Sequence, residues 1–323
     1  MNIGMALSKA EKILRNAESM TPALDAGVIL CFVLGCGRAY LLSHHERELG
    51  SDEERKFFEL VAKRAAGTPI QHITGYKEFM SLDFRVNPHV LIPRPETEIL
   101  TEAVLEYAKR RISYCASGKH MQILDLGTGS GCIAISLAHY LARYVDNFRN
   151  NHGIAAPAPG IPMPVKAVLS QQPQDVAFSI TASDISAEAL EVAKQNAVAN
   201  DVADKITFVL SNLFENLQNV VFDIIVSNPP YVPSREIQNL QVEVKDHEPL
   251  VALDGGEDGL YYYRKIIGKS PRHLNENGLL ALEAGYNQAA VIAQMMEGQG
   301  FKGIEIIKDL AGIDRVVLGT WIP

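Results

Sequence analysis

Ile123-Leu124-Asp125-Leu126-Gly127-Thr128-Gly129-Ser130-Gly131, near the middle of the 323-residue chain, decides the predicted fold. Residues 123–126 form a short apolar run typical of a buried strand, and residues 132–138 continue as a helix. The glycines between them let the backbone turn sharply and approach a bound ligand closely. Their Gly-x-Gly-x-Gly spacing is not the Gly-x-Gly-x-x-Gly of a dinucleotide fold, so it disfavours a nicotinamide cofactor.

A second acid follows the next predicted strand. Residues 178–183 read as that strand, Asp184 comes directly after it, and Ser186 is placed to cap the following helix. A carboxylate at this position can accept hydrogen bonds from both hydroxyls of a ribose, although helix capping is the structural alternative. A third strand over residues 206–210 ends at Ser211-Asn212-Leu213-Phe214, where it would border an adenine ring.

The fourth strand ends in Val226-Ser227-Asn228-Pro229-Pro230-Tyr231, directly after the apolar residues 220–225. Two successive prolines fix φ and remove two backbone donors, which leaves a stiff turn with free carbonyls. The Asn228 side-chain oxygen and the Pro229 carbonyl can each accept one hydrogen of a flat NH2 group, and Tyr231 can pack against its plane. The alternative is a simple strand-ending turn, since Asn-Pro often starts turns.

Strands and helices alternate through the rest of the chain. This pattern predicts an α/β fold with a doubly wound, mostly parallel sheet, and the last two strands would supply an antiparallel edge. The further predicted strands cover residues 278–283, 304–307 and 315–318, with helices over residues 261–267 and 288–296.

The chain before residue 99 has a different organisation. Residues 1–80 predict a small helical domain without a catalytic constellation, whose most economical role is partner binding. Residues 81–98 predict a hairpin and a proline-rich linker, in which Thr97 and neighbouring acids cap the next helix. Residues 99–323 form the sheet domain, and within it the Pro/Ala/Gln-rich residues 146–174 predict a mobile insertion.

Charge and composition limit the partners. The formal net charge of −8 disfavours a long nucleic-acid footprint, so we expect a protein partner and no direct nucleic-acid contact. The four cysteines form no Cys-x-x-Cys pair, and we expect no metal site. The chain has no apolar run of about 18 residues and no apolar signal core, so we expect a cytoplasmic monomer that does not span a membrane. An organellar protein that had lost a transit peptide would look the same.

Several motifs together carry a family resemblance. Asp125-x-Gly127-x-Gly129-x-Gly131, Asp184 and Asn228-Pro229-Pro230-Tyr231 resemble the class I S-adenosylmethionine-dependent methyltransferases that act on planar amine or amide nitrogens. A closer likeness is to the HemK/PrmC family of peptide chain release factor glutamine methyltransferases. It is carried by Gly67-Thr68-Pro69-Ile70-Gln71-His72-Ile73-Thr74-Gly75, Ile92-Pro93-Arg94-Pro95-Glu96-Thr97-Glu98 and the stretch from Glu248-Pro249 to Gly259-Leu260.

The resemblance implies a reaction and a set of site residues. The cofactor would be S-adenosylmethionine, leaving as S-adenosylhomocysteine, and the methyl group would go to the glutamine side-chain nitrogen in a release factor's Gly-Gly-Gln motif, tuning translation termination. Leu213 stands where relatives often carry an aromatic residue, and Asn212 stands in place of an acid. The resemblance implies that Gly127, Thr128, Gly129, Ser130 and Gly131 hold the methionine end of the cofactor, that Asp184 holds its ribose, and that Asn212 and Leu213 border its adenine. Asn228 is a further implied cofactor contact. The implied catalytic and glutamine-binding residues are Asn228, Pro229, Pro230 and Tyr231.

Three other functions remain open from the sequence. An adenine-N6 or other nucleic-acid amino methyltransferase would share the Asn-Pro-Pro-Tyr tetrapeptide, but it would require a basic groove. The substrate could instead be the glutamine of a ribosomal protein. A cofactor-binding scaffold without turnover is the non-enzymatic alternative, which the intact tetrapeptide disfavours.

Overall fold

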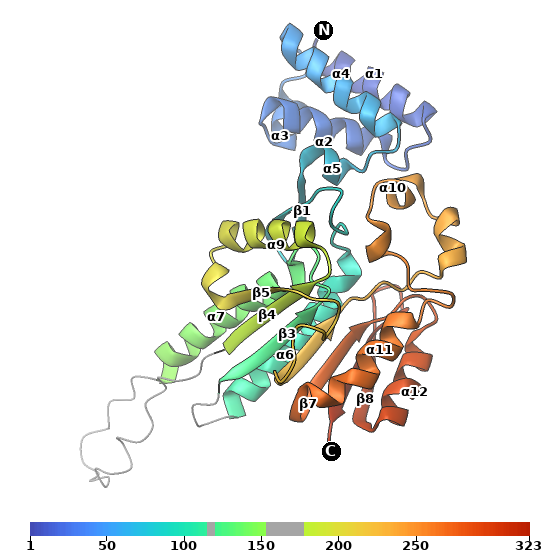
Figure 1. The fold of residues 1–323 in the computed structure, drawn as a ribbon. Coiled ribbons are helices and arrows are strands. Elements are labelled where there is room, and N and C mark those ends of the chain that lie inside the picture. Colours follow the sequence, from blue (N-terminus) through green and yellow to red (C-terminus); the bar gives the residue numbers. More distant parts are fainter. Residues whose placement is uncertain (115–119, 153–177) are drawn as a thin grey trace, which may run out of the picture.

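The computed structural model describes residues 1–114, 120–152 and 178–323. Its N-terminal region is a bundle of short helices (Figure 1). One shared apolar core, which includes Ile3, Leu14, Ile29 and Phe57, holds these helices together. Their bounds are α1 (Ile3–Asn16), α2 (Pro22–Leu34), α3 (Arg38–Ser43), α4 (Ser51–Ala65) and α5 (Ile70–Thr74).

Capping interactions set where two of these helices begin. The Asn2 side chain accepts a hydrogen bond from the backbone N–H of Met5 (2.9 Å), which caps α1. The Glu53 carboxylate accepts one from the backbone N–H of Gly50 (2.9 Å), and acids in the first turn of α4 favour the positive end of the helix dipole.

Two sheets follow in the chain. The first is the antiparallel hairpin of β1 (Tyr76–Phe79) and β2 (Leu82–Arg85), which begins before the predicted bounds of 81–98 and takes in the last residues of the predicted helical domain. Within the described residues, the second sheet has seven strands in the order β5-β4-β3-β6-β7-β9-β8. These strands are β3 (Met121–Leu126), β4 (Phe178–Asp184), β5 (Ile206–Leu210), β6 (Phe222–Ser227), β7 (Leu274–Glu283), β8 (Phe301–Lys308) and β9 (Asp314–Trp321).

The strand directions confirm the predicted fold class. Strands β5, β4, β3, β6 and β7 are parallel, whereas β9 is antiparallel to both β7 and β8. The chain winds outward from β3 in one direction through β4 and β5, and then in the other direction from β6. The order therefore reverses between β3 and β6, which is where open α/β sheets bind their ligands.

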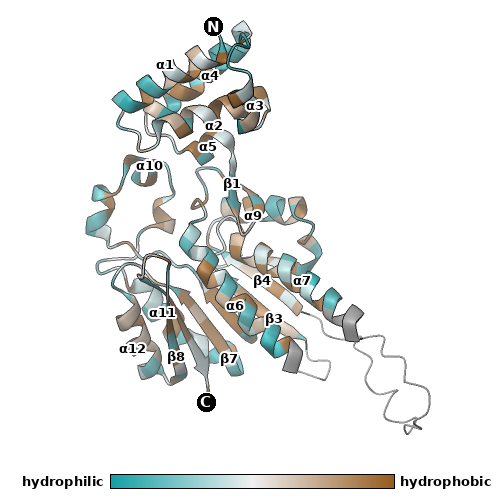
Figure 2. Cartoon of the chain, turned by 180° about the vertical axis from the view of Figure 1, so that it is seen from behind, coloured by the Kyte–Doolittle hydropathy of each residue, from teal (hydrophilic) through white to brown (hydrophobic). Residues whose placement is uncertain are grey.

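Helices cover both faces of this sheet. Side chains alternate along β3, so that Ile123 joins a core with α6 and α7 while Leu124 joins a core with α11 and α12. Figure 2 shows hydrophobic central strands and helices of mixed hydropathy. No helix in the described ranges is both long and apolar enough to cross a membrane. The bounds are α6 (Pro95–Tyr114), α7 (Cys132–His152), α9 (Ala187–Ala199), α10 (Val242–Lys245), α11 (Tyr261–Lys269) and α12 (Ala289–Gln299), with 3-10 turns η1 (Ala203–Lys205), η2 (Ser234–Asn239), η3 (Leu250–Ala252) and η4 (Ser270–Arg272).

Two local predictions differ from the structure. Helix α7 continues to His152, so residues 146–152 are helical, and the remaining residues of the predicted 146–174 insertion lie outside the described part of the chain. The prediction that Thr97 caps α6 is wrong, because this helix already begins at Pro95. Proline suits the first helical turn, where its missing N–H would have no helical partner.

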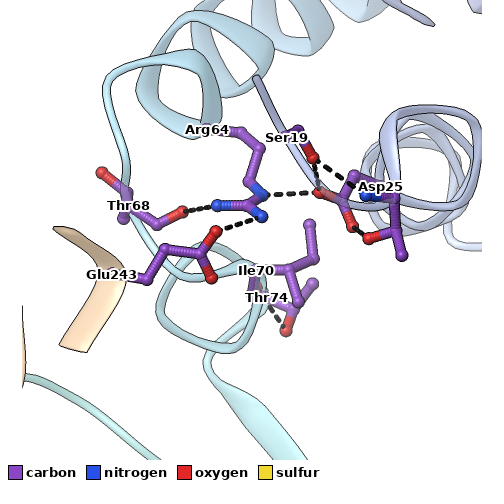
Figure 3. A network of polar contacts seen from close by, with 8 residues as sticks. Ser19, Asp25, Arg64, Thr68, Ile70, Thr74 and Glu243 are labelled. Carbon is purple, nitrogen blue, oxygen red and sulfur yellow. Dashed lines mark hydrogen bonds and ion pairs between the residues drawn. The ribbon is translucent and has the colours of Figure 1, made fainter. Parts of the chain in front are cut away.

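Arg64 connects the N-terminal helices to α10 of the sheet domain (Figure 3). Its Nε donates a hydrogen bond to Asp25 (2.7 Å), and one terminal nitrogen donates to the Thr68 carbonyl (3.2 Å). The other terminal nitrogen forms an ion pair with Glu243 in α10 (2.6 Å). One buried guanidinium therefore joins α2, α4 and α10.

Candidate active site

A pocket opens at the carboxyl ends of β3, β4, β5 and β6, at the point where the strand order reverses. The space between its walls is about 1020 Å3 with the open solvent at its mouth included. The segment that leads into α6 and residues 249–252 supply the other walls. The pocket therefore combines chain segments from both halves of the sheet.

The three glycines after β3 have two different roles. All three adopt positive φ, +78° at Gly127, +55° at Gly129 and +83° at Gly131. A Cβ at Gly131 would lie 2.8 Å from the side chain of Ile135 and 3.1 Å from that of Ala193, so this glycine allows α7 to pack against α9. A Cβ at Gly127 or Gly129 would meet no atom within 4 Å. At those two positions the bare backbone faces open space that a ligand can fill.

Asp125 supports the glycine loop from beneath. One oxygen, Oδ2, accepts hydrogen bonds from the Thr128 hydroxyl (2.6 Å) and from the Ala134 backbone N–H (3.1 Å). The other oxygen, Oδ1, is buried and has no partner among the described residues. Burial raises the pKa of Asp125 to about 7. A buried carboxylate with an unpaired oxygen favours a positively charged ligand at this loop.

Asp184 supports both the glycine loop and the start of α9, and its contact with a ribose stays a prediction. Its Oδ2 accepts a hydrogen bond from the Gly129 N–H (2.8 Å), and its Oδ1 accepts one from the Ser186 N–H (2.9 Å). The Ser186 hydroxyl in turn accepts from the Ala189 N–H (3.0 Å), which confirms the predicted cap of α9. Burial raises the pKa of Asp184. Each carboxylate oxygen keeps a lone pair that can accept from a ribose hydroxyl.

The end of β5 forms another wall of the pocket. Asn212 and Leu213 both line it, and Leu213 adopts a φ of 52°, which is unusual for a residue with a side chain. The Ser211 hydroxyl donates a hydrogen bond to the Leu213 carbonyl (2.7 Å) and holds this turn. The Asn212 amide donates to Glu215 (2.8 Å). Leu213 therefore offers an apolar surface at the position where relatives often carry an aromatic side chain.

Asn228 lies in the pocket lining, directly after β6. Its Nδ2 donates a hydrogen bond to the hydroxyl of Thr97 (3.1 Å), and no other hydrogen bond of this side chain occurs within the described ranges. The Ser227 hydroxyl donates to the Leu126 carbonyl (2.6 Å), which fixes the end of β6 against β3. The Asn228 oxygen Oδ1 is thus available to accept a hydrogen bond from a ligand.

The rest of the tetrapeptide is divided between the pocket and the interior. Pro229 and Pro230 line the pocket, whereas Tyr231 is not part of its lining. The Tyr231 ring lies where a Cβ on Gly285 would approach it to 2.9 Å, and its carbonyl accepts a hydrogen bond from Gln288 (3.0 Å). Burial raises the pKa of Tyr231 to about 12. Its contact with a substrate NH2 group stays a prediction.

An ion pair joins two walls of the pocket. One terminal nitrogen of Arg94 lies 2.9 Å and 2.8 Å from the two carboxylate oxygens of Glu248. Burial raises the pKa of Glu248 to about 7, against the opposing effect of Arg94. Arg94 and Pro249 both line the pocket, so this pair ties the entry of α6 to the segment after α10.

Most of the predicted site residues meet in this one pocket. Gly131 lies beneath the loop and Tyr231 beside the turn, outside the lining. Sequence reasoning missed the contact of Thr97 with Asn228, which spans 131 positions and has no local pattern. The sequence feature that could have pointed to this contact is the stretch Pro93-Arg94-Pro95-Glu96-Thr97-Glu98, which contains Thr97. The predicted residues that line the pocket are Gly127, Thr128, Gly129, Ser130, Asp184, Asn212, Leu213, Asn228, Pro229 and Pro230.

Known proteins are similar to this chain over nearly its whole length. A family model described as the PrmC N-terminal domain matches residues 5–75, and one described as a methyltransferase small domain matches residues 165–244. The release factor glutamine methyltransferase of Koribacter versatilis is 38% identical over 320 residues, which cover 99% of this chain and 98% of the relative. That of Clostridium acetobutylicum is 36% identical over 322 residues, which cover 99% of each.

A solved structure of the hMettl16 catalytic domain in complex with a 3'UTR hairpin has the same fold. It superposes with a TM-score of 0.50 at 16% identity and covers 82% of this chain and 84% of that chain. At that identity the similarity shows the fold alone.

Proposed function

Because the chain belongs to the family of release factor glutamine methyltransferases, we propose that it transfers a methyl group from S-adenosylmethionine to a glutamine side-chain nitrogen of a peptide chain release factor. The relatives that carry this name are matched from end to end at 36% and 38% identity. The observation that carries the proposal is that Asn228 and Pro229 line the same pocket as Asp184 and the glycine loop. An acceptor pair for an amide thus lies beside a site for a nucleoside.

The residues of the pocket fit this cofactor. Asp184 keeps lone pairs for a ribose, and the open space above Gly127 and Gly129 leaves room along bare backbone. The unpaired oxygen of Asp125 favours a cation. Asn212 and Leu213 would border the adenine, with Leu213 as the apolar contact. When bound, the cofactor supplies an electrophilic methyl group on a sulfonium sulfur.

Asn228 and Pro229 would hold the glutamine. An amide nitrogen is a poor nucleophile because its lone pair is delocalised into the carbonyl, so alignment with the methyl group contributes much of the rate. The Asn228 Oδ1 and the Pro229 carbonyl each accept one hydrogen of the NH2 group and aim the remaining lone pair. As positive charge develops on the nitrogen, both hydrogen bonds strengthen, which stabilises the transition state more than the ground state. The methylated nitrogen then releases one of its two protons to solvent.

The other parts of the chain would serve the protein substrate. We assign the glutamine to the Gly-Gly-Gln motif of the release factor, with an effect on translation termination in the cytoplasm. In this proposal the helices α1 to α5 form the partner-binding domain, the hairpin of β1 and β2 and the residues after it form the linker, and the chain from α6 onward forms the methyltransferase domain of a monomer. The matched N-terminal family model and the net charge of −8 support a protein partner over a nucleic acid.

Methyl-labelled S-adenosylmethionine tests the substrate. The protein is incubated with a release factor, with a version of it in which the Gly-Gly-Gln glutamine is alanine, and with ribosomes. Label that enters only the intact release factor is the expected result. Label in a ribosomal protein or in RNA, with none in the release factor, would overturn the assigned substrate.

A further inference from the structure

Two buried polar side chains close to Asn228 have no part in the mechanism above. Thr97, in the first turn of α6, is 2% exposed, and Glu283, the last residue of β7, is also 2% exposed. The Oε2 atom of Glu283 is buried and has no hydrogen-bond partner among the described residues. A buried carboxyl with an unpaired oxygen is destabilising, so its presence at this place calls for a physical explanation.

The sheet places Glu283 beside Asn228. Strands β6 and β7 are parallel neighbours, and Ser227 pairs with Leu282 in their register. The next residues along the chain are Asn228, directly after β6, and Glu283, the last residue of β7, so the two lie at the same level of the sheet. The first turn of α6 brings the Thr97 hydroxyl to this level as well, where it accepts a hydrogen bond from Asn228 Nδ2 (3.1 Å).

Thr97 also interacts with Glu283. Burial raises the pKa of Glu283 to about 7, and the nearby Thr97 side chain opposes that rise. A hydroxyl has one hydrogen to donate and two lone pairs that accept. When the hydrogen of Thr97 is donated to the Glu283 carboxylate, the hydroxyl oxygen can only accept from Asn228.

This arrangement leaves a single favourable orientation for the Asn228 amide. A flipped amide would place Oδ1 against the Thr97 oxygen, and two lone-pair-bearing oxygens would face each other without a hydrogen between them. Nδ2 must therefore face Thr97, and Oδ1 must face the pocket. A flipped Asn228 would present N–H donors to the substrate and would suit a carboxylate better than an amide.

We infer that Thr97 and Glu283 act as a positioning pair that locks the Asn228 amide with its oxygen toward the substrate, and so selects a glutamine amide over a glutamate carboxylate. This inference rests on the proposed function. Thr97 itself lines the pocket, but in this scheme both Thr97 and Glu283 act on the substrate through Asn228. The pair assigns a role to the buried acid at the end of β7.

A pair of isosteric substitutions tests the inference. Thr97→Val removes the hydroxyl next to Asn228, while Thr101→Val, one turn further along α6, removes a buried hydroxyl that donates only to the Thr97 backbone carbonyl (3.0 Å). We expect Thr97→Val to lower kcat on the release factor by about 10- to 100-fold, since a lost buried hydrogen bond is worth one to two factors of ten. S-adenosylmethionine affinity should not change. Thr101→Val should leave kcat unchanged, and Thr97→Ser should restore it.

Two further readouts separate positioning from general damage. A release factor with glutamate in place of the target glutamine should inhibit wild-type enzyme weakly and inhibit Thr97→Val more strongly. Glu283→Gln should also lower kcat, and the double variant with Thr97→Val should be no worse than the poorer single variant, because both changes release the same amide. Equal kcat for the Thr97→Val and Thr101→Val variants, or fully additive losses, would overturn the inference.

The same inference can be checked without any substrate. The side-chain amide resonances of Asn228, assigned with an Asn228→Asp variant, should shift in Thr97→Val and stay in place in Thr101→Val. An unshifted signal in Thr97→Val would refute the positioning pair. Failure of the proposed function would look different, because wild-type enzyme would then transfer no methyl group to the release factor.

Discussion

Asn228 is a residue whose two hydrogen-bonding ends have opposite character. Its Nδ2 is bound by Thr97, and its oxygen remains for a ligand in the pocket. The Pro229 carbonyl stands next to it on a turn that cannot donate from either proline nitrogen. Two acceptors on a stiff turn are complementary to an NH2 group, and in the proposed reaction this side-chain oxygen and this carbonyl hold the glutamine.

Removal of the Asn228 side chain should therefore affect the chemical step most. We expect Asn228→Ala to lower kcat by about 100- to 1000-fold, as for other lost groups that stabilise developing charge. The glycine loop and Asp184 are unchanged, so the Kd for S-adenosylmethionine should change much less than kcat. Steady-state kinetics and titration calorimetry measure both quantities. Asn239→Ala, at an exposed position in η2, is the matched control and should behave as wild type.

Cofactor affinity should depend on pH through the buried acids. Burial raises the pKa of Asp125 to about 7, and it also raises the pKa of Asp184. A cation is attracted to the ionised carboxylates, and its binding releases the proton that they hold at lower pH. The Kd for S-adenosylmethionine should therefore fall as pH rises through about 7 and then level off.

Calorimetry in buffers of different ionisation enthalpy would detect the released proton. The Asp125→Asn variant has no titrating carboxyl at position 125, so its Kd for S-adenosylmethionine should vary less between pH 6 and pH 8. The variation that remains should be on the order of the Asp184 effect alone. A wild-type Kd that does not change over this range would exclude the linkage.

At the scale of single elements, the loop between β3 and α7 shows how one motif meets two requirements. Gly131 is needed because α7 and α9 approach closely, while Gly127 and Gly129 face open space. The three residues look equivalent in the sequence. Their difference comes from the packing of α9, which is contributed by a distant part of the chain.

Alanine at each position should separate these requirements. Gly131→Ala should lower the free energy of unfolding by about 3 kcal/mol, because left-handed strain adds to overpacking against Ile135 and Ala193. Gly129→Ala should cost about 1 kcal/mol of stability through strain alone. The Gly129→Ala substitution should weaken cofactor binding by more free energy than it costs in stability, because the added methyl group enters the open space that the cofactor would fill. Urea unfolding and cofactor titration would measure the two effects, and normal cofactor affinity in Gly129→Ala would count against this assignment of the space.

Local pattern was sufficient to predict some elements and failed for others. The strand, loop and helix from residue 123 to residue 138 have clear periodicity, and Asp184 and Asn228 follow strands that could be recognised in the same way. The start of α6 at Pro95 could not be recognised, because Thr97 between Glu96 and Glu98 imitates a helix cap. The partner of Thr97 lies 131 residues away, and a contact of that length is set by the sheet order.

At the scale of the whole molecule, Arg64 connects the N-terminal helices to α10 of the sheet domain (Figure 3). Its side chain is 5% exposed and bridges Asp25, also 5% exposed, to Glu243, which is 36% exposed. No sequence pattern predicted this bridge, since its three members come from α2, α4 and α10. The helix bundle is thereby fixed near the segment that leads to the pocket wall at Pro249.

Substitutions in this bridge should differ in cost according to burial. Arg64→Met leaves Asp25 buried without its ion partner, and we expect a loss of about 3–5 kcal/mol in the free energy of unfolding. Glu243→Gln should cost less than about 1 kcal/mol, because that pair is partly solvated. Arg55→Met is the control on the same helix, where the arginine is 65% exposed, and it should have little effect. Chemical denaturation would measure all three, and equal costs for Arg64→Met and Arg55→Met would argue against the bridge.

The central claim is that this chain methylates a glutamine side-chain nitrogen of a release factor by means of Asn228. The most direct measurement is peptide mapping by mass spectrometry of a release factor after incubation with S-adenosylmethionine and either wild-type enzyme or Asn228→Ala. We expect one added methyl group on the glutamine of the Gly-Gly-Gln motif with wild-type enzyme, and a large loss of that signal with the variant. Methylation at another residue, or an equal signal from both enzymes, would contradict it.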